Sequence, residues 1–140
     1  MKVLKLNGDR LVTGKGALDY IKEIKGKRIF IVTGGKSMFA NGTIDRIKNM
    51  LDEYGKEYTI MSGIKKNPDT DVVNKGVIEM KEFKPDTVLS IGGGSPIDAA
   101  KVMAVFYEYP NLNFENVLKE SLPEIRKNVE FISVISKICE

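Results

Sequence analysis

A glycine-rich segment is the part of this sequence whose residues and spacing point most directly to chemistry. It reads Ile91-Gly92-Gly93-Gly94-Ser95-Pro96-Ile97-Asp98-Ala99-Ala100-Lys101 and joins a short apolar run to an amphipathic stretch. Successive glycines let a backbone turn sharply and approach a ligand closely. The first turn of a helix has unpaired N–H groups and a partial positive charge, so a helix that begins here can hold a phosphate. The segment therefore predicts an anion-binding turn between a strand and a helix.

The residues that follow the glycines are typical of a helix start. Ser95 suits the N-cap, Pro96 the first helical position and Asp98 the third, an arrangement close to a capping box. Asp98 either caps the helix or contacts a ligand, and the sequence leaves both roles open. A tight turn without a ligand is the simpler explanation of three glycines alone. The full string is more specific, although it is neither a Walker loop nor the pattern G-x-G-x-x-G.

Missing residue types restrict the chemistry of this chain. Its 140 residues include no histidine and one cysteine, Cys139. A Ser-His-Asp triad, a Cys-His pair, a histidine metal site and an internal disulfide are therefore excluded within these residues. We predict no catalytic residue and no metal ligand here.

The composition is that of a globular domain, with 42% hydrophobic and 29% charged residues. The net charge of +3 is too small to indicate nucleic acid. Residues 1–36 carry nine basic and three acidic residues, a net charge of +6, which either attracts an anionic ligand or forms a solvated lysine-rich surface. No apolar run approaches the roughly 20 residues of a membrane span, and no signal-peptide core is present. We expect no membrane partner and a cytoplasmic location.

Short apolar runs alternate with amphipathic stretches, which predicts βαβ units in one nucleotide-binding domain over residues 1–140. Asn7-Gly8-Asp9 favours a small hairpin at the start. We therefore expect an α/β fold with a Rossmann-like, open, mainly parallel sheet and helices on both faces. The expected strands are 3–6, 10–12, 28–32, 58–61, 87–91 and 131–135. The expected helices include 14–24, 96–107, a short one near 114–119, and two whose buried faces are Ile44, Ile47, Leu51 and Tyr54, and Val73, Val77, Met80 and Phe83.

The string from Gly92 to Lys101 resembles the signature of the iron-dependent (group III) alcohol dehydrogenases. The similarity extends over about residues 1–110 and includes four further segments. They are Gly14-x-Gly16-Ala17-Leu18, Ile31-Val32-Thr33-Gly34-Gly35-Lys36-Ser37, Asn67-Pro68 and Lys84-Pro85-Asp86. Glycerol dehydrogenases and dehydroquinate synthases also have a Gly-Gly-Gly loop in a similar fold, and a non-catalytic binding module is a third interpretation. The Ser95-Pro96-x-Asp98 continuation and the Asn67-Pro68 turn favour the alcohol dehydrogenases.

The resemblance implies a dinucleotide site, with the pyrophosphate on the loop formed by Gly92, Gly93, Gly94, Ser95 and Pro96. Asp98 matches an acid after that loop. Asn67 matches a cofactor contact, although an Asx-type turn before Pro68 explains it equally well.

The loop after the first cofactor strand bears on the choice between NAD and NADP. Members of the family that prefer NAD have an Asp there, whereas this chain has Gly35, Lys36 and Ser37. Small glycines leave room for a 2′-phosphate, Lys36 can supply charge and Ser37 can donate a hydrogen bond. The resemblance thus favours NADP, with NAD as the alternative. In the simpler interpretation, Lys36 points to water.

The sequence departs from the family pattern after the last expected strand. The family's loop ending Gly-Thr-Gly-Ser-Glu has no counterpart, nor has the helical domain that supplies one Asp and three His to iron or zinc. The resemblance therefore implies a truncated, NAD(P)-binding part of an oxidoreductase that transfers hydride between a nicotinamide and an alcohol or aldehyde. We expect it to be inactive alone, and to self-associate or pair with a separate helical domain through the face that such a domain covers.

We expect the purified chain to retain no iron or zinc and to oxidise no simple alcohol with NADP or NAD. The reason is that its residues include no histidine to hold the metal that polarises the alcohol oxygen. Metal analysis after dialysis, together with the absorbance of reduced nicotinamide, measures both properties. One bound metal ion per chain, or turnover above a protein-free control, would contradict this expectation.

Overall fold

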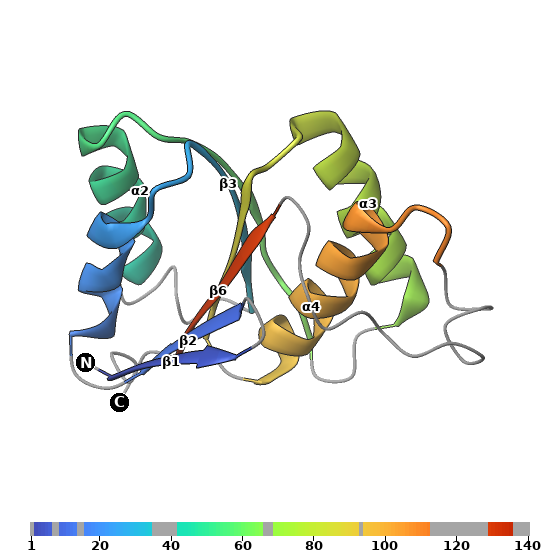
Figure 1. The fold of residues 1–140 in the computed structure, drawn as a ribbon, viewed down its shortest axis with the longest axis horizontal. Helices are drawn as coiled ribbons and strands as arrows, with labels where there is room; N and C mark the ends of the chain where they lie inside the picture. Colours follow the sequence, from blue (N-terminus) through green and yellow to red (C-terminus); the bar gives the residue numbers. More distant parts are fainter. Residues whose placement is uncertain are drawn as a thin grey trace.

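Six strands form one sheet in the order β1-β2-β6-β5-β3-β4 (Figure 1). β1 pairs antiparallel with β2, and all other neighbours are parallel, which confirms the predicted hairpin and the mainly parallel sheet. The computed structural model describes residues 2–6, 9–13, 16–34, 42–65, 69–92, 94–112 and 129–135. The strands are β1 (Lys2–Leu6), β2 (Asp9–Thr13), β3 (Arg28–Thr33), β4 (Glu57–Met61), β5 (Thr87–Ile91) and β6 (Glu130–Ile135).

Helices cover both faces of this sheet, as expected (Figure 1). The 3-10 helix η1 (Ala17–Glu23) and α2 (Thr43–Glu53) pack on one face, and α3 (Thr70–Phe83) and α4 (Gly94–Glu108) pack on the other. None of these helices is long and apolar enough to cross a membrane, in the part of the chain that the structure describes. The predicted helix near residues 114–119 lies outside the described residues.

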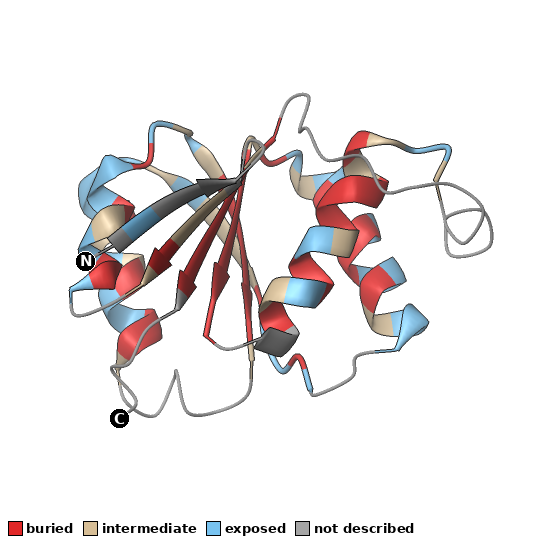
Figure 2. Cartoon of the chain, turned by 60° about the horizontal axis from the view of Figure 1, so that its bottom comes forward, coloured by how far each residue is buried: buried red, intermediate tan, exposed pale blue. Residues whose placement is uncertain are grey.

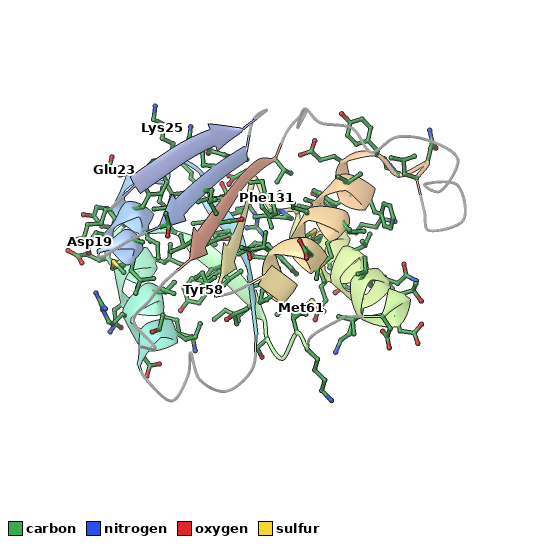
Figure 3. The ribbon with its side chains drawn as sticks, turned by 90° about the horizontal axis from the view of Figure 1, so that it is seen from below. Asp19, Glu23, Lys25, Tyr58, Met61 and Phe131 are labelled. Carbon is green, nitrogen blue, oxygen red and sulfur yellow. The ribbon has the colours of Figure 1, made fainter. Side chains whose placement is uncertain are left out.

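The central strands are buried on both faces because each has a helix layer on either side. In β3, Ile29 and Ile31 face η1 and α2, whereas Phe30 and Val32 face α3 and α4. This explains why β3 and β5 are continuous apolar runs instead of alternating ones. Figure 2 shows the buried residues on the central strands and on the inner sides of the helices, with the exposed residues outside. Phe131 of β6, labelled in Figure 3, belongs to the α3–α4 side of this core.

Two details of the predicted helices are corrected by the structure. Tyr54 is 49% exposed instead of buried, because α2 ends at Glu53 and Tyr54 is its C-cap. Gly55 follows in the left-handed conformation, with φ of 69°, as its position after the helix predicts. α4 begins at Gly94, so Ser95 lies inside the helix instead of capping it, and Asp98 lies beyond the first turn.

The amino ends of β3 and β5 are joined by one carboxylate. Asp86, just before β5, accepts hydrogen bonds from the backbone N–H of Lys27 at 2.9 Å and of Arg28 at 3.2 Å, and from Thr87 Oγ1 at 2.9 Å. Gly26 allows this approach, since a Cβ there would lie 2.3 Å from Asp86 Oδ1 and 2.2 Å from Thr87 Oγ1. The Lys84-Pro85-Asp86 segment thus has a structural role, because Asp86 connects the amino ends of β3 and β5.

Two basic side chains, Arg28 and Lys56, add further contacts at this amino edge. Arg28 donates to the carbonyl of Phe83 at 2.6 and 3.1 Å, stacks over the Phe83 ring and pairs with Glu57. Lys56 Nζ donates to the carbonyls of Ile24 and Gly26 at 2.9 and 2.6 Å. The amino edge of the sheet is therefore fixed by charged groups that already have partners.

We expect Asp86→Ala to lower the free energy of unfolding by about 1.5–3 kcal/mol, because two backbone N–H groups lose a charged acceptor. Gly26→Ala should cost about 1–3 kcal/mol through overpacking. In an Asp86→Ala background the Gly26→Ala penalty should shrink by at least about 0.5 kcal/mol, because one of the two groups that the new methyl meets is gone and the other, Thr87 Oγ1, no longer has the carboxylate that holds it in place.

Urea unfolding of the two single variants and the double variant measures this coupling. Glu53→Ala, at an exposed position on α2, is the control and should stay within about 0.5 kcal/mol of the wild type. If the losses of unfolding free energy in Asp86→Ala and Gly26→Ala add up in the double variant, the close approach of residue 26 to the Asp86 carboxylate does not explain these losses.

Candidate functional site

A crevice is expected where the chain reverses its direction of travel across the sheet. From β3 the chain moves outward to β4 through α2, then crosses back to β5 through α3 on the opposite face. The segments that follow β3 and β5 therefore leave for opposite faces, although the two strands are direct neighbours and end level, with Thr33 paired to Ile91. In open α/β sheets, ligands bind at the carboxyl ends of the strands at such a point.

Gly34 lies at the centre of this junction, directly after β3. Its carbonyl accepts the N–H of Gly63 at 2.8 Å, and the preceding Thr33 carbonyl accepts the N–H of Ile64 at 3.3 Å. A Cβ placed on Gly34 would lie 3.5 Å from Pro96 Cγ and 3.7 Å from the Ile64 carbonyl oxygen. Segments that follow β3 and β4 thus meet the first turn of α4 around this glycine.

The turn into α4 has the geometry that an anion site needs. Gly92 is buried, donates its N–H to the Val134 carbonyl at 3.1 Å and has a φ of 124°, a value that residues with a side chain rarely adopt. α4 begins two residues later and runs for 15 residues, so its unpaired N–H groups and dipole point toward the carboxyl edge. Pro96 is buried in the first turn, where its missing N–H costs nothing.

A buried hydroxyl without a partner lies at the same edge. Thr33 is fully buried, and its Oγ1 has no hydrogen-bond partner among the described residues. A second such group, Ser90 Oγ, lies on β5 two residues before Gly92. An unsatisfied buried hydroxyl costs about 1–3 kcal/mol. Thr33 lies on the η1–α2 side of the sheet and Ser90 on the α3–α4 side, so a separate polar partner at each hydroxyl would recover part of that cost.

The structure places some of the predicted site residues and not others. Gly92 lies at the end of β5, and the backbones of Gly94 and Ser95 form the start of α4 next to Pro96. Asp98 is exposed on α4, and its predicted capping role is wrong because the helix begins earlier. A contact between Asp98 and a ligand stays a prediction. Gly93, Gly35, Lys36, Ser37 and Asn67 lie outside the described residues.

Sequence reasoning missed the contribution of the segment after β4. Gly63 and Ile64 bind the end of β3, and Ile64 is buried in the α3–α4 side of the core. The only hint in the sequence is a glycine, Gly63, two residues after a strand, and its φ of 81° confirms a turn there. Such a glycine indicates a turn, but not which neighbour the turn contacts.

In the part of the chain that the structure describes, no three His, Cys, Asp or Glu side chains lie close enough together to hold a metal ion. The described residues therefore do not fit iron or zinc.

Burial raises the pKa of Tyr58 and of Tyr107, with further increases from the negative charges of Asp52 and Glu108. Tyr58 belongs to β4 and Tyr107 to the last turn of α4, so neither takes part in the turn after β5.

Comparison with known proteins identifies the relatives of this chain. A family model described as iron-containing alcohol dehydrogenase matches residues 8–138. An NADPH-dependent butanol dehydrogenase of Clostridium saccharobutylicum is 40% identical over 124 residues, which cover 88% of this chain and 32% of that protein. NADH-dependent butanol dehydrogenase A of Clostridium acetobutylicum is 44% identical over 100 residues, which cover 68% of this chain and 26% of that protein.

A solved structure shows the same fold. The crystal structure of NADH-dependent butanol dehydrogenase A from Thermotoga maritima superposes with a TM-score of 0.78 at 29% identity, covering 96% of this chain and 34% of that one. The chain thus spans about a quarter to a third of the length of these relatives.

We expect Gly92→Ala and Gly34→Ala to differ sharply in their effect on folding. Gly92→Ala puts a side chain on a residue with φ of 124° and should cost about 1–3 kcal/mol of unfolding free energy. Gly34→Ala adds a methyl at ordinary contact distance, 3.5 Å from Pro96 Cγ, without positive φ, and should stay within about 1 kcal/mol of the wild type. Urea unfolding of both variants measures their unfolding free energies. Equal losses of free energy in the two variants would show that the positive φ of Gly92 does not cause the destabilisation.

Proposed function

This chain belongs to the iron-containing alcohol dehydrogenase family, and we propose that it is the part of such an enzyme that binds the nicotinamide dinucleotide, with NADP preferred over NAD. The observation that supports this most is the junction at Gly34, where the ends of β3 and β4 meet the first turn of α4. It lies at the reversal point of the sheet, where dinucleotides bind in open α/β folds.

The residues at this junction have different proposed roles. The N–H groups at the start of α4 hold the diphosphate, because they are unpaired within the helix and lie at its positive end. Gly92 allows the sharp turn that places them there. Gly34 and Pro96 keep the two loops close together without a bulky side chain between them. Asp98 and Asn67 are proposed as further contacts to the dinucleotide.

Hydride transfer is proposed for the whole enzyme and not for this chain alone. A bound nicotinamide supplies a hydride donor or acceptor, while the protein supplies binding and orientation. The described residues bind and orient a dinucleotide but include no group that fits a metal, so no step through iron or zinc is derived for them.

The preference for NADP is proposed from the loop after β3. Gly35 leaves room for a 2′-phosphate, Lys36 offers a charge and Ser37 a hydrogen-bond donor. An Asp in this loop would repel the phosphate. The relatives do not decide the question, because one is named for NADPH and another for NADH.

Other expectations from the sequence stay predictions. Self-association, or pairing with a helical metal-binding domain, is proposed for the face that such a domain would cover. The same holds for the absence of nucleic acid and membrane partners and for a cytoplasmic location. A binding module without catalysis is the alternative to part of an enzyme.

Thermal-shift titration tests dinucleotide binding itself. We expect NADP and NAD each to raise the midpoint of unfolding, because a ligand that binds only the folded state stabilises it by mass action. No shift with either dinucleotide would favour an interaction module that binds no nucleotide.

We expect NADP to bind at least about ten-fold more tightly than NAD, and Lys36→Ala to remove most of that difference, because it removes a charge-assisted bond to the 2′-phosphate. Ser37→Ala should remove a smaller part. Calorimetry at one fixed ionic strength measures all of these affinities, since a lysine contact is screened by salt. Equal affinities in the wild type, or an unchanged preference in Lys36→Ala and Ser37→Ala, would disprove the assignment to NADP.

A further inference from the structure

The segment after β4 borders the same junction as the loop after β3. Ser62, Gly63, Ile64 and Lys65 follow the last residue of β4, Met61, which Figure 3 labels. The N–H groups of Gly63 and Ile64 bond the carbonyls of Gly34 and Thr33, so this segment is fastened to the end of β3 by two hydrogen bonds. Ile64 is also buried, so packing holds the segment in addition to these hydrogen bonds.

Lys65 is placed at the junction by these contacts. It directly follows Ile64, whose carbonyl oxygen lies 3.7 Å from the Cβ position of Gly34. Lys65 itself is exposed and forms no ion pair within the part of the chain that the structure describes, where the ion pairs are Arg10–Glu130 and Arg28–Glu57. The backbone that carries this long cationic side chain is thus held one residue from the site.

We infer that Lys65 is a second determinant of cofactor specificity, whose ammonium pairs with the 2′-phosphate of NADP. This inference rests on the proposed function, because it assumes a dinucleotide at the junction. It goes further by assigning a role to the segment after β4, a different part of the chain from the loop that contains Lys36.

The order of the strands favours the 2′-phosphate over the diphosphate as the partner of Lys65. The glycine turn follows β5, and β3 separates β5 from β4. Neighbouring strands lie about 4.8 Å apart, so the end of β4 is about 10 Å from the end of β5. In NADP the adenosine ribose is bonded directly to the diphosphate, and its 2′-phosphate lies on the far side of that sugar. A diphosphate on α4 with its adenosine ribose over Gly34 therefore brings the 2′-phosphate toward Lys65.

The charge of the ligand gives a second reason. A phosphate monoester carries about −1.5 to −2 at neutral pH, which one lysine neutralises only in part. Lys36 and Lys65 belong to the segments that follow β3 and β4, the two strands on this side of the glycine turn. Two cations from separate segments can neutralise the dianion, whereas NAD, which lacks this phosphate, gains little from either.

The test is the affinity of Lys65→Gln for NADP and for NAD, measured by calorimetry on the full chain. We expect about a ten-fold loss of NADP affinity, because a charge-assisted bond is removed, and an NAD affinity within about two-fold of the wild type. Lys65→Arg keeps the charge and should retain most of the preference for NADP. The dependence of NADP affinity on salt should weaken in Lys65→Gln, since one cationic contact is lost.

Lys25→Gln is the matched control, because it removes the same charge from an exposed lysine just before the amino end of β3. Figure 3 labels Lys25 and Met61, which lie far apart. Both affinities should be unchanged in this variant. All variants should unfold at the wild-type midpoint, since the two lysines are exposed.

Three results overturn the inference in distinguishable ways. Equal losses for NADP and NAD in Lys65→Gln would assign Lys65 to the diphosphate that both share. An unchanged NADP affinity in Lys65→Gln, with a wild type that prefers NADP, would remove Lys65 from the site and leave the proposed function standing. A wild-type chain that binds neither dinucleotide would refute the proposed function and this inference together.

Discussion

The pairing of β3 with β5 is the constraint on which the rest of this structure depends. The two strands are neighbours in the sheet but are separated in the sequence by α2, β4 and α3. At their amino ends Asp86 holds them together by accepting the N–H groups of Lys27 and Arg28, and Gly26 is small enough to permit it. At their carboxyl ends the chain leaves toward opposite faces. The two strands are hydrogen-bonded together at their amino ends, and the segments that follow them separate at their carboxyl ends. Space for a ligand is therefore expected at the carboxyl ends.

The two edges differ in how their polar groups are used. At the amino edge, Arg28, Lys56 and Asp86 all have partners, so these charges stabilise the fold. At the carboxyl edge, the hydroxyl of Thr33 is buried without a partner among the described residues, and Lys65 forms no ion pair there. Charges that already have partners stabilise the fold, whereas the exposed side chain of Lys65 can still pair with a ligand. The contrast supports an anion at the carboxyl edge and a structural role for the amino edge.

The sequence predicted the elements well because burial alone determines them. The apolar run of β3 and the spacing of Ile44, Ile47 and Leu51 on α2 follow directly from helix layers on both faces of a sheet. The start of α4 was less predictable: the helix begins at Gly94, two residues before the expected Pro96, and this shift places Asp98 beyond the first turn. The contacts of Gly34 with Pro96 and with the Ile64 carbonyl could not be predicted. They join three segments far apart in the sequence, and local residue patterns carry no information about such distances.

The site depends on backbone more than on side chains, and this determines which properties can vary among relatives. The helix start, the φ of Gly92 and the hydrogen bonds of Gly34 require only glycines and main-chain groups. Selectivity between NADP and NAD depends on interactions with one phosphate, the 2′-phosphate, which lies away from the helix start proposed for the diphosphate. Relatives within one family are named for NADPH and for NADH, which agrees with a choice made by side chains near the turn and not by the turn itself. Position 65 is of this kind, because Lys65 is exposed and a change of its charge alters neither the core nor the hydrogen bonds of Gly63 and Ile64.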